Sequence, residues 1–203
     1  MRPAAVWGYF PCASQGNDLV VFHEDGRTER ERFSFPRQDF AETICLSDYF
    51  SPGETATDVV GIFAVTMGEV VTQRAKELFE ADRYQDYMFL HGLGVECAEA
   101  LAEYFHREMR RELDIAQADS PTISKLFKKH YRGCRYAFGY PACPRLEDQA
   151  KLFRLLDPNR IGLYLSDQFQ LEPEQSTTAL VVHHPQAKYF NTSKSVAAMM
   201  AEG

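Results

Sequence analysis

The apolar run at residues 59–66 constrains the fold most, because so apolar a segment has to be buried. It contains five apolar residues that are β-branched or aromatic: Val59, Val60, Ile62, Phe63 and Val65. Such residues favour β-strands, and a short continuous run of them is consistent with a strand buried on both faces. The Ser51-Pro52-Gly53 sequence interrupts regular structure before it. We therefore expect a central strand here, with a sheet built around it.

Further strand-forming segments precede this run. Residues 5–10 and 19–23 are β-prone, and Asp25-Gly26 predicts a tight hairpin turn before a strand at residues 28–33. Residues 38–50 form either a short helix or an irregular cover. The first third of the chain is therefore predicted to consist mainly of antiparallel strands.

Helix-forming segments follow the central strand. Residues 69–80 and 84–113 contain few helix-breaking residues. In the second segment, apolar residues recur every three or four positions and predict a buried stripe: Val95, Ala98, Ala102, Phe105 and Met109. Ser120-Pro121 opens a short predicted helix at residues 122–130, and residues 146–156 form another that stops at Asp157-Pro158.

The end of the chain returns to strand-forming sequence, at residues 177–183 and, as a short strand, at residues 188–191. Strands gathered early and helices gathered later predict an α+β fold. The chain has no internal repeat and no low-complexity linker. We therefore expect one domain over residues 1–192, followed by a frayed tail at residues 193–203.

Charge and composition exclude several classes of function. A net charge of −7 argues against general affinity for nucleic acid or for an anionic membrane. No apolar run reaches the roughly 20 residues of a membrane-spanning helix, and the start lacks the features of a signal peptide. The five cysteines include no CxxC pair and are typical of reduced thiols. We therefore expect a cytoplasmic protein.

The segment at residues 132–144 is the best candidate for a ligand site. It combines arginine, aromatic, glycine and proline residues, and Gly139 favours irregular backbone whose N–H and C=O groups a ligand can use. Arg135 offers a planar fork suited to a carboxylate. The alternatives are a structural connector, with Arg135 on the surface or paired to Asp148. Cys134 and Cys143, without clustered histidines, make a poor metal site.

The sequence RxxxGYPACP, which begins at Arg135, resembles a motif of one family, the cobalamin-dependent methionine synthases, in their C-terminal activation domain. Other blocks follow in the family's order: RPAAVWGYFP from residue 2, GNDLVVF from 16, CLSDYF from 45, VGIFAVTMG from 60, EDQAK from 147, LSDQF from 165 and HPQAKYF from 184. The resemblance therefore extends from residue 2 to residue 190.

The resemblance implies a curved antiparallel sheet with packed helices, in a single C-shaped domain. It also implies binding of S-adenosylmethionine for reductive reactivation of the enzyme. Arg135 matches the arginine that holds the methionyl carboxylate of this ligand. Tyr140 and Ala142 match pocket residues; taken alone, Tyr140 is equally well explained as a half-buried packing residue.

Two more regions match ligand contacts. Family members often carry two tyrosines near the end of the domain; Tyr189 keeps the first, and Phe190 replaces the second. The alternative is an aromatic pair on an edge strand. Glu99 matches a glutamate expected near the cofactor-facing side. Its alternative is a solvated helix face, which it would share with Glu103, His106 and Arg110.

The resemblance also defines what this sequence lacks. A helical arm that precedes this region in the family carries an aspartate for the ligand's ammonium group, and no such DWTPFF-like sequence occurs here. The barrel, homocysteine, folate and cobalamin modules are absent as well. We therefore expect a fragment of a methyltransferase that is not catalytic alone.

In this reading, the cobalamin belongs to another module, which the chain caps as a monomer, and a flavodoxin-like protein or a reductase supplies the electron. The alternative function is a capping or docking domain with little ligand binding of its own. A free-standing methyltransferase is disfavoured, because the chain has no glycine-rich nucleotide loop.

Overall fold

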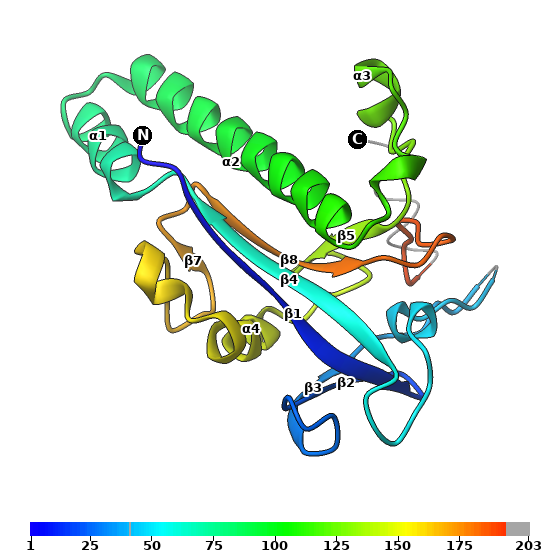
Figure 1. Ribbon diagram of the computed structural model, residues 1–203. Helices are drawn as coiled ribbons and strands as arrows, with labels where there is room; N and C mark the ends of the chain where they lie inside the picture. The colour runs from blue at the N-terminus through cyan, green and yellow to red at the C-terminus, as the bar shows by residue number, and fades with distance from the viewer. Residues whose placement is uncertain (41, 194–203) are drawn as a thin grey trace. The chain divides into compact units, whose positions relative to one another are not determined.

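The apolar run forms strand β4 (Asp58–Thr66), which lies between β1 and β8 in a six-stranded antiparallel sheet. In this computed structural model, which describes residues 1–40 and 42–193, the strand order is β3-β2-β1-β4-β8-β5 (Figure 1). From Val60 onward every residue of β4 is buried. The predictions of a central strand and of an α+β fold are therefore confirmed.

The predicted N-terminal strands are confirmed as β1 (Ala4–Gln15), β2 (Asp18–Phe22) and β3 (Glu29–Ser34). β1 and β2 form a hairpin in which Gln15 lies opposite Asp18. The hairpin turns at Gly16, whose φ of 63° favours glycine. The cover at residues 38–50 is irregular, with one short 3-10 helix, η1 (Leu46–Tyr49).

The two long predicted helices are confirmed as α1 (Glu69–Glu80) and α2 (Tyr84–Glu112) (Figure 1). The predicted helix at residues 146–156 consists of η3 (Leu146–Asp148) and α4 (Gln149–Leu156). The remaining elements are η2 (Ala116–Ala118), α3 (Ile123–Leu126), β5 (Cys134–Ala137), η4 (Pro158–Ile161), β6 (Tyr164–Leu165), β7 (Leu171–Glu172) and β8 (Ser176–Val182).

Contacts divide the chain into two compact units. The first unit consists of Met1–Gly8, Ile62–Arg107 and Leu146–Ala179. The second consists of Tyr9–Gly61, Glu108–Arg145 and Leu180–Gly203, of which residues 41 and 194–203 lie outside the described part. β1, β4, β8 and α2 contribute residues to both units.

In the first unit, α1 and α2 pack around a small apolar cluster. Met67, Val71 and Ala98 form its buried centre. Val95 was predicted to belong to the buried stripe of α2, but it is 38% exposed. The neighbouring Gly94 is buried instead, and a Cβ on it would come within 2.6 Å of Gln175 Cγ. The stripe is therefore shifted at its N-terminal end, because this helix turn approaches Gln175 through a glycine.

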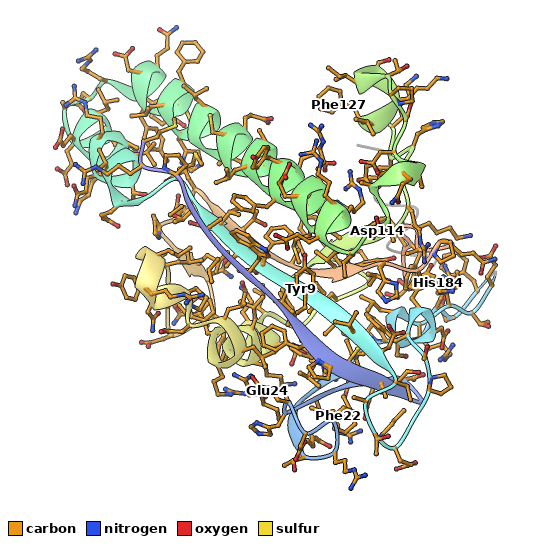
Figure 2. The ribbon with its side chains drawn as sticks, viewed as in Figure 1. Tyr9, Phe22, Glu24, Asp114, Phe127 and His184 are labelled. Carbon is orange, nitrogen blue, oxygen red and sulfur yellow. The ribbon has the colours of Figure 1, made fainter. Side chains whose placement is uncertain are left out.

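In the second unit, the C-terminal end of α2 lies against β4 at Gly61. A Cβ on Gly61 would lie 2.7 Å from Met109 Cε and 3.1 Å from Val181 Cβ, so a side chain has no room there. Tyr9 is labelled in Figure 2, and its hydroxyl donates a hydrogen bond of 2.6 Å to Glu112 Oε2 at the end of the helix. Glycine in a strand commonly marks such a close approach.

Three sequence predictions need correction. The helix expected at residues 122–130 is reduced to α3 (Ile123–Leu126), because Lys129 adopts a left-handed φ of 60°. The strand expected at residues 188–191 is absent, and the Lys188 carbonyl instead accepts a hydrogen bond from Tyr136. The segment at residues 132–144 is not irregular throughout, because it contains β5, an edge strand of the sheet.

The frayed tail predicted at residues 193–203 falls, apart from Ser193, outside the described residues. Within residues 1–40 and 42–193, no helix has the length and apolar character needed to cross a lipid bilayer.

Gly133 precedes β5 and should tolerate no larger residue. It has a φ of 88°, and a Cβ would lie 2.6 Å from the Val182 carbonyl oxygen. Gly133→Ala should therefore lower the free energy of unfolding by about 2–4 kcal/mol, measured by urea denaturation.

Gly92→Ala is the matched control, since no heavy atom lies within 4 Å of its added Cβ and the residue lies inside α2. It should leave stability unchanged or raise it slightly. Equal effects of the two substitutions would contradict the close approach at Gly133.

Candidate functional site

Arg135 lies in the middle of β5, where buried and partly exposed residues alternate. Cys134 and Tyr136 are buried, whereas Arg135 and Ala137 are partly exposed. Because successive side chains of a strand point to opposite faces, Arg135 lies on the face opposite Tyr136. Arg135 is thereby only partly buried, while the other face of β5 is packed with aromatic rings.

A tight turn follows β5 and contains the GYPAC sequence. Gly139 has a φ of 88°, and its N–H donates to the Cys143 carbonyl at 2.9 Å. The Cys143 N–H donates in turn to the Tyr140 carbonyl at 2.8 Å. These bonds leave the Tyr140 side chain 52% exposed and bury Ala142. The turn therefore presents one aromatic ring to the surface on a hydrogen-bonded backbone.

Tyr136 is the centre of an aromatic cluster that includes the predicted residues Tyr189 and Phe190. The Tyr136 and Tyr189 rings stack with centroids 6.4 Å apart, and the Phe190 ring meets Tyr136 edge-on at 6.2 Å. Tyr49 packs against both Tyr136 and Phe190 at 6.4 Å. The Tyr136 hydroxyl donates to the Lys188 carbonyl at 2.7 Å, which positions the residues that follow.

Tyr189 and Phe190 differ in what they can offer a ligand. Phe190 is 6% exposed and wedged between rings, so its role in this structure is packing. The Tyr189 hydroxyl is also buried, and it has no hydrogen-bond partner among the described residues. Burial raises the pKa of Tyr189, and the neighbouring Tyr140 and Cys134 raise it further. The phenol is thus a neutral donor with unused hydrogen-bonding capacity.

The structure brings Tyr189 and Phe190 together around Tyr136, and Tyr140 and Ala142 lie in the turn that follows the same strand. Arg135 occupies the opposite face of the same short strand. Glu99 belongs to the first unit, where it is exposed on α2. Glu99 was expected to share a solvated helix face with Glu103, His106 and Arg110. This prediction is wrong in part, since His106 and Arg110 are buried. The functional roles of these residues remain predictions.

The segment leading to Tyr189 is anchored at His183. Its Nε2 lies 2.7 Å from Asp58 Oδ1 at the start of β4, and its carbonyl accepts a hydrogen bond of 2.9 Å from Arg132 Nε. Burial opposes the charged form of Asp58, but the bonds from His183 and from the Ser51 and Val59 N–H groups outweigh it. They hold the pKa of this carboxyl at about 2. Asp58 is thus a charged anchor for the segment that leads to Tyr189.

A second buried anchor holds the chain between α2 and β5. Arg110 is 1% exposed and pairs with Asp119 through Nε at 3.1 Å and Nη2 at 2.9 Å. Its guanidinium carbon also lies 4.0 Å from the centroid of the Tyr131 ring. A planar, always charged side chain suits this combination of a bidentate pair and a ring contact. Arg110 therefore positions residues 119–131.

Sequence reasoning missed Tyr49 and Tyr136 as parts of the site. Tyr49 lies in the CLSDYF block, which was noted for its resemblance alone. Tyr136 follows Arg135, and in a strand the two side chains point to opposite faces. The sequence did not predict a strand here, so this signal was not used. The described cysteines are free, and no group of three or more His, Cys, Asp or Glu residues could hold a metal within the described part.

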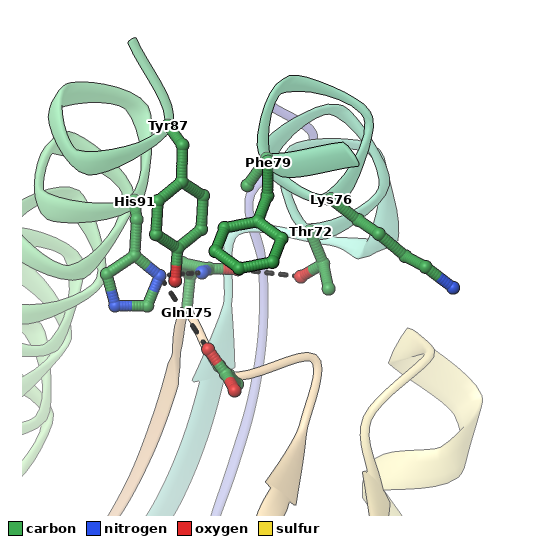
Figure 3. A pocket seen from close by; sticks show the side chains of 8 residues that line it. Thr72, Lys76, Phe79, Tyr87, His91 and Gln175 are labelled. Atoms are coloured by element: carbon green, nitrogen blue, oxygen red, sulfur yellow. Dashed lines mark hydrogen bonds and ion pairs between the residues drawn. The ribbon is translucent and has the colours of Figure 1, made fainter. Parts of the chain in front are cut away.

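The first unit contains a separate hollow of about 230 Å³ beside Gln175 (Figure 3). The Gln175 amide oxygen accepts a hydrogen bond of 2.7 Å from Thr72 Oγ1, and its nitrogen lies 3.2 Å from His91 Nδ1. The lining residues are Thr72, Ala75, Lys76, Phe79, Tyr87, His91, Glu174 and Gln175. None of the predicted site residues is among them.

Comparisons with known proteins converge on one family. The model of the family described as "Vitamin B12 dependent methionine synthase, activation domain" matches residues 1–199. The chain is 48% identical over 201 residues to the methionine synthase of Mycobacterium tuberculosis (strain ATCC 25618 / H37Rv) and 47% identical to that of Mycobacterium leprae (strain TN). Each match covers 93% of this chain and 17% of the relative, so the chain spans less than a fifth of their length.

Among solved structures, the chain is similar to the "Crystal Structure of the MetH Reactivation Domain bound to AdoHcy". The TM-score is 0.84 at 26% sequence identity. The match covers 98% of this chain and 66% of that one.

The anchor at Asp58 predicts an acid-sensitive fold. A carboxyl whose pKa is about 2 in the folded protein, against 3.8 ordinarily, stabilises the fold fully above about pH 4 and loses this contribution as the pH falls toward 2. Asp58→Asn should be less stable than the wild type at pH 7, and its stability should fall less between pH 4 and 2. Urea denaturation across this range measures both effects.

The exposed Asp167→Asn variant serves as the control and should follow the wild-type curve. An Asp58→Asn curve that runs parallel to the wild type through this pH range would contradict the anchor.

Proposed function

The chain belongs to the family of vitamin B12 dependent methionine synthase activation domains, whose model matches residues 1–199, and from this premise we propose that it binds S-adenosylmethionine for the reductive reactivation of a methionine synthase. The observation that carries the proposal is the similarity, at a TM-score of 0.84 over 98% of the chain, to a reactivation domain bound to AdoHcy. AdoHcy is the product that S-adenosylmethionine becomes after it has given up its methyl group.

The residues present suit such a ligand. Arg135 presents a planar cation on the partly exposed face of β5, which can hold a carboxylate through two parallel hydrogen bonds. Tyr140 offers an exposed ring, on which a flat base or a sugar can pack. The buried Tyr189 hydroxyl has no partner among the described residues, and a ligand atom can satisfy it. Phe190 supports the Tyr136 and Tyr189 rings.

When bound, S-adenosylmethionine supplies an activated methyl group, and a cobalamin on another module is the group that accepts it. The task of this chain is to hold its ligand in one orientation, which lowers the entropic part of the barrier. Arg135 fixes one end of the ligand, and the aromatic residues fix the other and keep water away. Proton transfer is not needed, in keeping with a neutral, raised-pKa Tyr189.

Two partners follow from this role. The relatives are more than five times longer than the matched segment, which supports a cobalamin-binding module of methionine synthase as the first partner. The second is an electron donor, a flavodoxin-like protein or a reductase. A monomeric state and a cytoplasmic location complete the proposal.

Loss of Arg135 should weaken ligand binding. Arg135→Ala should raise the dissociation constant for S-adenosylmethionine by about tenfold to a hundredfold, because a charge-assisted bidentate pair is lost. Isothermal titration calorimetry measures this change. Arg145→Ala is the matched control; that exposed arginine donates to the Ser34 carbonyl and should leave the affinity unchanged.

Absence of heat from the wild-type chain at millimolar ligand would refute the proposal. The chain would then be a docking domain with little ligand binding of its own. The buried Phe190, which cannot offer the second hydroxyl, is the observation that favours this alternative.

Tyr189→Phe should separate a ligand contact from a packing role. Because its hydroxyl is buried and has no hydrogen-bond partner in the described part of the chain, removing it should leave the free energy of unfolding unchanged or raise it by up to about 1 kcal/mol. The affinity for S-adenosylmethionine should nevertheless fall by about threefold to tenfold. Thermal denaturation and calorimetry on the same sample test both effects.

Tyr136→Phe provides the contrast. Its hydroxyl donates to the Lys188 carbonyl, so this variant should lose about 1–2 kcal/mol of stability. An unchanged affinity in Tyr189→Phe would show that the Tyr189 hydroxyl does not contact the ligand.

A further inference from the structure

The charge of residues 120–146 is opposite to that of the chain as a whole. The sequence holds 29 acidic residues and 22 Lys and Arg residues, yet this segment contains no acidic residue. It contains six of the basic ones: Lys125, Lys128, Lys129, Arg132, Arg135 and Arg145. A concentrated positive segment in an acidic protein creates a local field that attracts anions.

The lysines of this segment also differ from the others in how they are neutralised. Within the described part of the chain, each lysine outside it lies close to a carboxylate: Lys76 to Glu80, Lys151 to Asp148 and Lys188 to Glu42. Lys125, Lys128 and Lys129 form no ion pair with any described residue. No carboxylate of residues 1–40 and 42–193 therefore compensates these three positive charges.

These side chains line a hollow of about 660 Å³ in the second unit. Lys125, Lys128, Lys129, His130 and Arg132 contribute its basic groups, and Tyr131 forms part of its wall. The volume falls within the roughly 300–1,000 Å³ typical of small-ligand sites. Phe127 projects from the same turn and is 76% exposed (Figure 2).

The wall of the hollow is held in place before any ligand binds. The Ser120 N–H donates to the His130 carbonyl at 3.0 Å, and Arg132 Nε donates to the His183 carbonyl at 2.9 Å. Tyr131 lies under the guanidinium of Arg110, which the buried pair with Asp119 fixes. A preformed wall lowers the ordering cost of binding.

Lys129 occupies a backbone position that favours glycine. Its N–H donates to the Leu126 carbonyl at 2.8 Å, and the His130 N–H donates to the Lys125 carbonyl at 3.1 Å. Together with the φ of 60° at Lys129, this pattern is a Schellman motif ending α3, in which glycine is the preferred residue. A lysine is present there despite the backbone strain.

From these observations we propose that the hollow is a binding site for a compact, multiply charged anion of the phosphate class. Such an anion fits because several separate cations surround one concave space, and each can pair with a different phosphate oxygen. The site is distinct from the one proposed for S-adenosylmethionine and does not depend on it. The two sites adjoin at Lys129, whose Nζ lies 5.3 Å from the centroid of the Tyr189 ring, and at Arg132, which donates to the His183 carbonyl.

Calorimetry at constant ionic strength with sodium pyrophosphate, ATP and adenosine tests this site. Pyrophosphate and ATP should bind, and adenosine should not, because the phosphates carry the recognition. In K125Q/K128Q/K129Q the affinity for pyrophosphate should fall by about tenfold or more, since each exposed charge contact contributes a factor of about two to five. No heat from the wild type at millimolar pyrophosphate would overturn the proposal.

The control variant K76Q/K151Q/K188Q removes the same net charge from the three paired lysines and should bind pyrophosphate like the wild type. Equal losses in the two triple variants would overturn the proposal, because they would reflect net charge alone. The single variant K129G separates binding from stability, because glycine adopts the positive φ at this position without strain. It should be at least as stable as the wild type and still bind pyrophosphate less tightly; unchanged affinity in this variant would exclude Lys129 from the site.

Discussion

The close approach between β4 and the end of α2 is the constraint on which the second unit depends. Gly61 lets Met109 reach the central strand, where any side chain would meet Met109 and Val181. Tyr9 secures the same helix end through Glu112. Because the helix is held this closely, the next residue along it, Arg110, lies in the interior and has to be neutralised by Asp119. The same helix end therefore carries both a close contact with the central strand and a buried charge.

That buried charge organises the surface that follows it in the chain. Arg110 binds Asp119 and covers Tyr131, so it holds both ends of the segment that carries Lys125, Lys128 and Lys129. Breaking a buried pair by removing one partner leaves a charge without compensation, which is far more costly than losing a surface pair. The lysines themselves are exposed, and the buried pair of Arg110 and Asp119 holds the segment that carries them.

The candidate ligand site depends on a different principle, the two-residue period of β5. One face of this strand carries Tyr136 and with it the packed rings of Tyr49, Tyr189 and Phe190. The other face carries Arg135. A cation and an aromatic cluster are thus presented by adjacent residues without the arginine having to be buried.

The sequence by itself determined the elements whose signals are local: the apolar run of β4, the strands before it, and the long breaker-poor helices α1 and α2. It also indicated, through its motifs, Arg135, Tyr140 and Tyr189 as candidate site residues, but not Tyr49 or Tyr136. It could not show that Gly94 rather than Val95 faces the interior, or that His106 and Arg110 are buried, because helical period does not reveal which face meets a sheet. Only the tertiary structure decided that residues 188–191 stay irregular, that Phe190 packs between rings, and that the Tyr189 hydroxyl has no hydrogen-bond partner among the described residues. Those outcomes depend on Tyr49 and Tyr136, which are distant in sequence, and long-range packing of this kind leaves no local pattern.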